Sequence, residues 1–290
     1  MDQAAMLREI AGRKKAVPNA GIRGKSPASK NKICVISVTS GKGGVGKTNI
    51  TANLAYLLSK MRKKTLILDA DCGLANIDLI LGLTPQYNLY NVLKGEKTLK
   101  ETIINGPGGI KILPSSSGVQ EMSSLSIEQK LVLQGELNNL HSRPDFMLID
   151  TSAGINENVM YFNMISGKII VVVTPEPTSM TDAYALIKLL HQRHAKKRFS
   201  LLVNQVKSQE EAKEVFLRMA QATNHFLNLA IEHLGYVSYD ENLIKAVKHQ
   251  KLLAELYPDS PAIKCLQSVA EKICQMEQDQ EDNGIMTFFN

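Results

Sequence analysis

A glycine- and lysine-rich stretch from Ser40 to Thr48, with the sequence SGKGGVGKT, places the strictest limit on how this chain can fold. The β-branched apolar run before it, from Ile33 to Val38, predicts a buried strand, and the apolar spacing from Asn53 to Leu58 predicts a helix. A glycine loop between a strand and a helix is the arrangement of a P-loop, in which backbone N–H groups and the positive helix end surround a polyphosphate. We expect the nucleotide to be contacted by the whole loop and the first helical turn: Gly41, Lys42, Gly43, Gly44, Val45, Gly46, Lys47, Thr48 and Asn49.

Two side chains of this loop are suited to particular tasks. Lys47 is placed to neutralise the β and γ phosphates, and the Thr48 hydroxyl is placed to hold Mg²⁺. An ordinary glycine-rich turn between a strand and a helix is the alternative. The number of matching positions, in the right context, favours a nucleotide site.

Acidic residues end two further predicted strands. The apolar run from Thr65 leads to Asp69 and Asp71, and the run from Phe146 ends at Asp150. Ligands of an open parallel sheet bind beyond the carboxyl ends of its strands, so we expect these carboxylates beside the loop. Asp150 ends its strand in the Walker B form and is the expected partner of the magnesium ion. The alternative for Asp69 and Asp71 is that they cap the following turn. Two carboxylates downstream of a P-loop favour a catalytic role instead.

Short apolar runs that alternate with helical patterns set the fold class. Further strands are expected near 110–114, 168–174, 199–204 and 234–237, and further helices near 126–140 and 260–278. Another helix is expected to be capped by Ser179 or Thr181 and to run through Leu190, and strand 168–174 is expected at the sheet centre. The alternation predicts an α/β fold over residues 33–278: a doubly wound, mostly parallel sheet with helices on both faces.

Positive charge is concentrated at the start of the chain. Residues 1–32 hold eight Lys or Arg residues and two acidic ones, an excess of six that equals the net charge of the whole chain, +6. The remaining residues are formally neutral, so the basic balance describes an arm rather than the folded body. No apolar run approaches the ~18–20 residues of a membrane-spanning helix, and no secretory signal is expected. The four cysteines lack C-x-x-C spacing, which indicates reduced thiols and a cytoplasmic location.

The two ends of the chain are expected to differ from the body. Residues 1–12 have the spacing of an amphipathic helix that is too short to be stable alone, and residues 13–32 have the composition of a disordered linker. Residues 279–290 combine an acidic tail with an apolar tip. The apolar side chains of this tip would line one helix face: Ile285, Met286, Phe288 and Phe289.

Lys42, the first lysine of the loop, carries a resemblance to a known family. The loop resembles the deviant Walker A motif, K-G-G-x-G-K-[ST], of the MinD/ParA ATPases. In that family the extra lysine reaches across a nucleotide-sandwich dimer to the partner's phosphates, where a cation in trans stabilises the charge of phosphoryl transfer. A solvated lysine beside a basic loop is the alternative. The stretch from Asp69 to Asp78 resembles the family's D-x-D-x-G-L-x-N-x-D segment, so Asp71 would orient the attacking water and Asp69 would support the lysine and magnesium network.

Three further segments match the same family. Thr151 to Gly154 resembles its D-[ST]-x-A-G segment, whose backbone can sense the γ-phosphate. The resemblance implies that Asn204 contacts adenine and that Tyr239 belongs to a second nucleotide-contacting loop. It also implies ATP or ADP and Mg²⁺ as cofactors.

Two stretches point to one branch of this family. Residues 177–188 closely resemble the E-P-T-S-x-T-D-A-Y-A-L-I-K run of the FlhG (FleN) ATPases of flagellar number, and residues 2–8 match their D-Q-A-x-x-L-R activator helix. That helix stimulates FlhF, an SRP-type GTPase, so Gln3, Leu7 and Arg8 would bind such a partner. Relatives dock on the membrane through a C-terminal amphipathic helix, which the apolar tip resembles in shortened form. No Lys or Arg follows Lys272 to meet anionic lipid, and a frayed tail packed on its own domain or dimer is the alternative.

The resemblance implies an ATPase that limits flagellar number and placement. It would form a homodimer with ATP and cycle between the cytoplasm and the inner face of the cytoplasmic membrane at the cell pole. Its partners would be FlhF, the flagellar C-ring switch proteins and a master transcription activator, with no specific nucleic acid. A ParA-type DNA segregation ATPase is the alternative, which the neutral body disfavours. A regulator that binds nucleotide but scarcely hydrolyses it is another.

Overall fold

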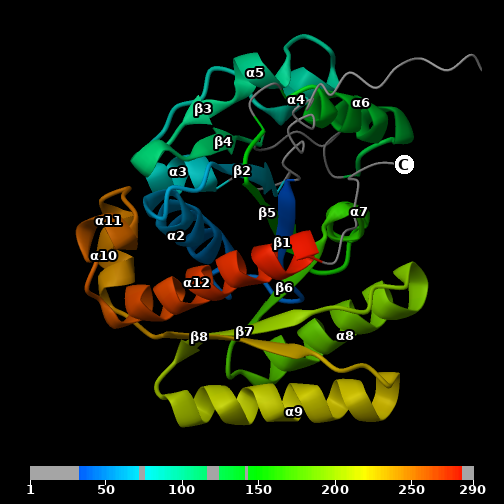
Figure 1. Cartoon of the computed structure of the whole chain (residues 1–290), viewed down its shortest axis with the longest axis vertical. Coiled ribbons are helices and arrows are strands. Elements are labelled where there is room, and N and C mark those ends of the chain that lie inside the picture. Colours follow the sequence, from blue (N-terminus) through cyan, green and yellow to red (C-terminus); the bar gives the residue numbers. More distant parts are fainter. Residues whose placement is uncertain (1–32, 72–75, 116–123, 141–142, 283–290) are drawn as a thin grey trace, which may run out of the picture. The chain divides into compact units, whose positions relative to one another are not determined.

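The computed structural model describes residues 33–71, 76–115, 124–140 and 143–282, and these form an eight-stranded sheet (Figure 1). The strand order is β3-β4-β2-β5-β1-β6-β7-β8, and every neighbouring pair is parallel except β3 with β4. The strands are β1 (Cys34–Ser40), β2 (Thr65–Ala70), β3 (Ile104–Asn105), β4 (Lys111–Leu113), β5 (Phe146–Ala153), β6 (Lys168–Val173), β7 (Ser200–Val206) and β8 (Glu232–Ser238). The predicted mostly parallel α/β sheet is confirmed.

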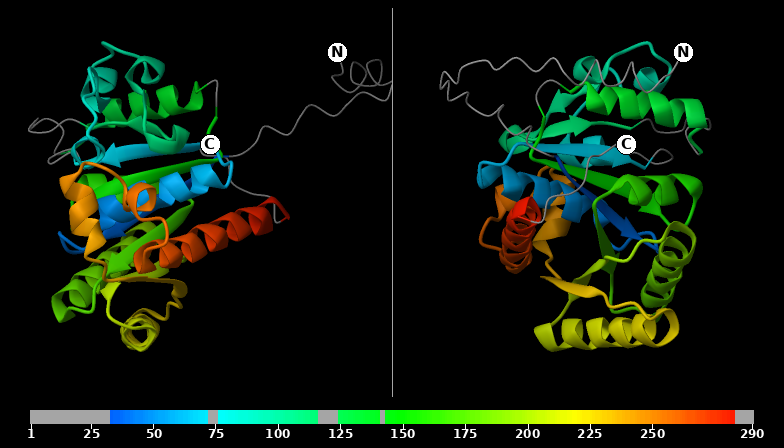
Figure 2. Two further views of the ribbon diagram at one scale, coloured as in Figure 1. Left: turned by 90° about the vertical axis from the view of Figure 1, so that its left-hand side faces the viewer. Right: turned by 45° about the vertical axis from the view of Figure 1, so that its right-hand side comes forward.

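Helices cover both faces of this sheet (Figure 2). Side chains of β1 alternate between the faces: Ile36 and Val38 pack with α2 and α12, whereas Val35 packs on the other side. Strands buried on both faces are those of a doubly wound fold. The helices are α2 (Lys47–Lys60), α3 (Ile77–Leu81), α4 (Leu89–Leu93), α5 (Leu99–Thr102), α6 (Ile127–Asn138), α7 (Glu157–Ile165), α8 (Pro177–His194), α9 (Gln209–Leu227), α10 (Asn242–Lys248), α11 (Leu253–Leu256) and α12 (Pro261–Asp282), with a 3₁₀ turn at Pro107–Gly109. None of the helices within the described ranges has both the length and the hydrophobicity to cross a membrane.

The start of α8 differs from the sequence prediction. The helix begins at Pro177, with Glu176 rather than Ser179 or Thr181 at the cap position. Proline has no N–H group that needs a cap and its fixed φ suits the first helical turn. The Ser179 hydroxyl instead accepts a hydrogen bond from the Thr174 backbone N–H (3.0 Å), and Thr181 Oγ1 donates back to the Pro177 carbonyl (3.0 Å).

Two other expectations also need correction. The most hydrophobic strand, β6, is interior, but β5 and β1 hold the two central positions of the sheet. The acidic residues expected after the last helix fall inside it, because α12 runs to Asp282. Glutamate and glutamine are good helix formers, so this composition does not end a helix.

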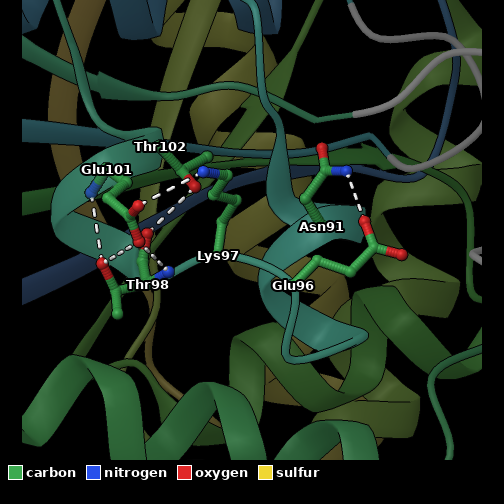
Figure 3. A network of polar contacts seen from close by, with 6 residues as sticks. All are labelled: Asn91, Glu96, Lys97, Thr98, Glu101 and Thr102. Atoms are coloured by element: carbon green, nitrogen blue, oxygen red, sulfur yellow. Dashed lines mark hydrogen bonds and ion pairs between the residues drawn. The ribbon is translucent and has the colours of Figure 1, made fainter.

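Local polar contacts explain α4 and α5, two of the three short helices between β2 and β4, which the sequence patterns missed (Figure 3). At α5, Thr98 and Glu101 form a capping box in which Glu101 Oε2 accepts from the Thr98 N–H (2.9 Å) and hydroxyl (2.8 Å). These bonds, with that from Lys97, lower the pKa of Glu101 to about 2. Asn91 of α4 donates to Glu96 (2.9 Å). Such short helices depend on their caps, because too few residues are present for propagation.

Candidate nucleotide site

The predicted P-loop lies at the carboxyl edge of the sheet, between β1 and α2. Gly46 precedes α2 with φ 91°, a left-handed conformation that glycine adopts without strain. Gly41 is required for a different reason: a Cβ atom there would lie 2.2 Å from the backbone of Asp182 in α8. The loop therefore packs directly against the first turns of α8 and leads into the N-terminus of α2, the end of a helix that attracts anions.

Lys47 is buried at the centre of the loop, with 8% of its surface exposed. Its ammonium group donates to the Ser40 hydroxyl (2.9 Å), which in turn donates to the Lys42 carbonyl (2.7 Å). Burial lowers the pKa of Lys47, while the charges of Asp150 and Asp71 act in the opposite direction. A buried ammonium group among carboxylates at the loop is placed to meet phosphate oxygens.

Asp150 and Thr48 meet as the sequence predicted. Asp150, in β5, is 1% exposed, accepts a hydrogen bond from Thr51 Oγ1 (3.3 Å) and is hydrogen-bonded by the Thr48 side chain. Burial raises the pKa of Asp150 to about 6, although Thr48 and the Lys47 charge lower it. A hydroxyl and a carboxylate are oxygen donors of the kind that Mg²⁺ prefers, usually together with phosphate and water oxygens. These two residues therefore fit a magnesium ion.

Asp69 and Asp71 stand beside this pair and differ in burial. Asp69 is 1% exposed and lies directly across from Asp150 in the β2–β5 register. Burial, and then the Asp150 charge, raise the pKa of Asp69 well above its ordinary value. Asp69 Oδ1 accepts from the Asp71 N–H (3.0 Å), so Asp69 fixes the backbone from which the half-buried Asp71 projects. Asp71 is close enough to influence the pKa of both Lys47 and Asp150.

The Lys42 side chain extends away from the buried Lys47. Its ammonium group pairs with the Glu176 carboxylate and donates to Thr178 Oγ1 (2.9 Å), both at the start of α8. More than a third of the Lys42 side chain is exposed, at 37%. The sequence patterns did not identify Glu176 and Thr178 as its partners. The sequence pointed to these two residues only in that they belong to the segment that resembles the FlhG ATPases.

Asn204 is placed beside the loop and lines a cavity. Its Nδ2 donates to the Val45 carbonyl (2.7 Å), whereas the Val45 side chain is buried in the core. Asn49, Asn204 and Tyr239 line the same cavity of about 200 Å³, whose walls are mostly apolar. Apolar walls with a few convergent polar groups suit a heterocyclic base, and the amide group of Asn204 can both donate and accept.

Several residues of this cavity were missed, among them Gln205. Gln205 lines it and has φ 59°, a left-handed conformation that is uncommon for residues other than glycine. The predicted partner-binding residues Gln3, Leu7 and Arg8 lie outside the described residues. The predicted membrane-binding residues also lie outside them: Ile285, Met286, Phe288 and Phe289.

A P-loop at the carboxyl edge of a doubly wound sheet, with Asp150 beside Thr48, defines a P-loop nucleoside triphosphatase. A family model described as AAA domain matches residues 33–203. The antiactivator FleN of Pseudomonas aeruginosa is 40% identical over 265 residues, which cover 91% of this chain and 95% of FleN. The flagellum site-determining protein YlxH of Helicobacter pylori is 34% identical over 255 residues, 85% of each chain.

A solved structure agrees with these relatives. The MinC:MinD cell division protein complex of Aquifex aeolicus contains a chain with a TM-score of 0.69 and 28% identity, which covers 83% of this chain and 96% of that one. This chain belongs to the MinD/ParA-like family of P-loop ATPases, in the branch that contains FleN and YlxH. It is an ATPase.

Proposed function

We propose that this chain is an Mg·ATP-dependent dimerising ATPase that regulates the number and placement of flagella. The observation that carries the proposal is the position of Lys42. This lysine projects from the loop, away from the buried Lys47, to exposed partners at the start of α8. A cation in that position can serve the nucleotide of a facing subunit once it leaves Glu176. The relatives called antiactivator FleN and flagellum site-determining protein YlxH support the flagellar role.

The site residues divide the chemistry of hydrolysis among them. Thr48 and Asp150 would hold Mg²⁺, which when bound neutralises charge on the phosphates. Lys47 would contact the β and γ phosphates of ATP, and Asp71 would orient the attacking water. Lys42 would then add a positive charge from the partner subunit, so that hydrolysis depends on dimerisation. After hydrolysis this attraction is reduced and the subunits separate.

During this cycle the protein would move between the cytoplasm and the membrane. A single apolar tip at residues 285–289 binds lipid weakly, and a dimer presents two, which raises the avidity. ATP therefore favours the inner face of the cytoplasmic membrane and ADP favours the cytoplasmic monomer. Residues 1–12, with Gln3 at the start, would stimulate the GTPase FlhF, and the C-ring switch proteins and a master transcription activator are the other proposed partners.

A ParA-type DNA segregation ATPase is the second candidate. The basic excess of residues 1–32 favours nonspecific DNA binding, but residues 33–290 have no net charge to contribute. A DNA pull-down with ATP that weakens steeply with salt, and is lost on deletion of residues 1–32, would support this candidate.

Sizing of the Asp71→Ala protein tests the main proposal. With its hydrolysis blocked, it is expected to be a dimer with ATP and a monomer with ADP, and to bind anionic liposomes only with ATP. Deletion of residues 284–290 is expected to remove liposome binding and to leave the dimer intact. A protein that stays monomeric with every nucleotide would overturn the dimer, and full liposome retention after the deletion would overturn the membrane tip.

A further inference from the structure

The pairing of β1 with β5 is interrupted where the two strands reach the nucleotide site. One residue of β1, Thr39, lies opposite two residues of β5, Thr151 and Ser152. Such a bulge bends the strand and changes the direction of the residues that follow it. The next residue of β1 is Ser40, whose hydroxyl accepts from Lys47. The extra residue belongs to β5, so the bulge changes the direction of the β5 residues that follow it, beside the loop that begins at Ser40.

A buried polar cluster occupies this bulge. Asn163 of α7 is 0% exposed, and its Oδ1 accepts from the Ser37 hydroxyl (2.8 Å). Its Nδ2 lies within donating distance of Thr39 Oγ1 (3.2 Å) and the Val159 carbonyl (2.8 Å). Thr39 Oγ1 is also 3.0 Å from Thr151 Oγ1. Hydrogen bonds thus join α7 to both strands that end at the site.

Polar groups are costly at this depth unless all of them are paired. Ser37, Thr39, Thr151 and Asn163 are each at most 1% exposed, and each has at least one partner. Apolar side chains of the same shape would fill this space without that requirement. A satisfied network of this kind fixes one geometry more strictly than apolar packing does. We propose that Asn163 is a positioning residue for ATP hydrolysis, which acts through Thr39 and Thr151 rather than by contact with the nucleotide.

The segment between β5 and α7 explains how this would act on hydrolysis. Gly154 follows the bulge, and its N–H donates to the Ser40 carbonyl (3.0 Å). Thr151 anchors the segment at its start, and Asn163 anchors the helix that follows it. The segment is therefore held in register with the P-loop from both ends. Loss of the network would leave the P-loop itself in place but allow the segment beside it, which begins at Gly154, to shift.

The whole 290-residue chain can be tested with substitutions that conserve shape. Thr39→Val replaces one hydroxyl by a methyl group, and Asn163→Leu removes the amide. Each is expected to lower kcat about tenfold, because a small misplacement at a reacting centre is costly, and to change KM and ADP affinity less than about twofold. The double variant is expected to lose no more than either single one, since both break the same network. Thr39→Ser, which keeps the hydroxyl, is expected to retain wild-type kcat.

Asn158→Leu is the matched control. Asn158 is another buried asparagine of α7, at 3% exposed, but its Oδ1 accepts from the Leu125 N–H (2.9 Å), outside the network. It is expected to lower the melting temperature as Asn163→Leu does and to keep kcat within about twofold. Wild-type kcat in both Asn163→Leu and Thr39→Val would overturn the proposal, as would kcat losses that multiply in the double variant. If Asn163→Leu does not fold, the comparison of Thr39→Val with Thr39→Ser decides the matter.

Discussion

Lys42 of the phosphate-binding loop pairs with Glu176, 134 residues further along the chain, at the position that precedes α8. The two side chains are 37% and 60% exposed. Exposed ion pairs of this kind contribute only about 0–1 kcal/mol. The pair therefore gives Lys42 a defined direction within one subunit, at a free energy that binding to a partner's phosphates can readily exceed.

Substitution of each member of this pair should have very different effects. Lys42→Ala is expected to abolish the proposed ATP-dependent dimer, because it would remove the charge that each subunit contributes to the other in that proposal. Glu176→Gln removes only a carboxylate that competes weakly with phosphate for Lys42. The ATP concentration that gives half-maximal dimerisation is therefore expected to fall, by less than about fivefold. Sedimentation velocity over a range of ATP concentrations measures both. An unchanged profile for Lys42→Ala would contradict the role of this lysine in trans.

Two glycines of the loop offer a matched pair. A Cβ atom at Gly41 would lie 2.2 Å from the backbone of Asp182, whereas one at Gly43 would have its nearest neighbour, Ala153 Cβ, at 3.9 Å. Gly41→Ala must separate the loop from α8, and we expect its melting temperature without nucleotide to fall by more than about 5 °C. Gly43→Ala is expected to change it by less than about 2 °C. Equal melting temperatures would show that the loop adjusts freely to a side chain at Gly41.

The sequence alone could predict much of this site, because strand ends of a parallel sheet share one edge. Lys47, Thr48 and Asp150 each follow or end a recognisable strand, so their meeting needed only the fold class. The pairing of Lys42 with Glu176 could not be predicted in this way, since it depends on how closely α8 approaches the loop. The bulge at Thr39 was hidden for a similar reason. The Thr39 hydroxyl cannot be assigned a partner from the sequence, because that partner depends on the register between β1 and β5.

Asn204 should distinguish base recognition from support of the loop. Its amide donates to the Val45 carbonyl (2.7 Å) and faces the cavity beside α2. Asn204→Ala is expected to weaken ATP binding by up to about tenfold, the value of one lost hydrogen bond. The affinity for GTP is expected to fall less, because the guanine edge does not present the same groups to this amide. Equal losses for both nucleotides, measured by calorimetry, would assign Asn204 to support of the loop alone.

Asp150 should make the empty protein less stable as the pH rises. Its pKa is raised to about 6 by burial, compared with about 4 in an unfolded chain. Between these values the folded protein keeps a proton that the unfolded chain has released, so the stability from this group is present below about pH 4 and lost as the pH rises through about 6. Asp150→Asn cannot ionise, and it is expected to be more stable than the wild type at pH 8 by about 1–3 kcal/mol. The same variant is expected to lose ATP hydrolysis.

Denaturant unfolding in EDTA without nucleotide, from pH 4.5 to pH 8, measures this difference directly. The advantage of Asp150→Asn should be small at pH 4.5, grow through about pH 6 and then remain level, because no further proton is lost from this carboxyl group. Asp145→Asn is the control for removal of one charge, since Asp145 lies at the opposite end of β5 and bonds the Lys64 N–H (2.7 Å). A wild type more stable than Asp150→Asn at pH 8 would show that Lys47 and Thr48 compensate fully for the buried charge. The Asp150 carboxylate would then stabilise the fold in addition to its proposed role in magnesium binding.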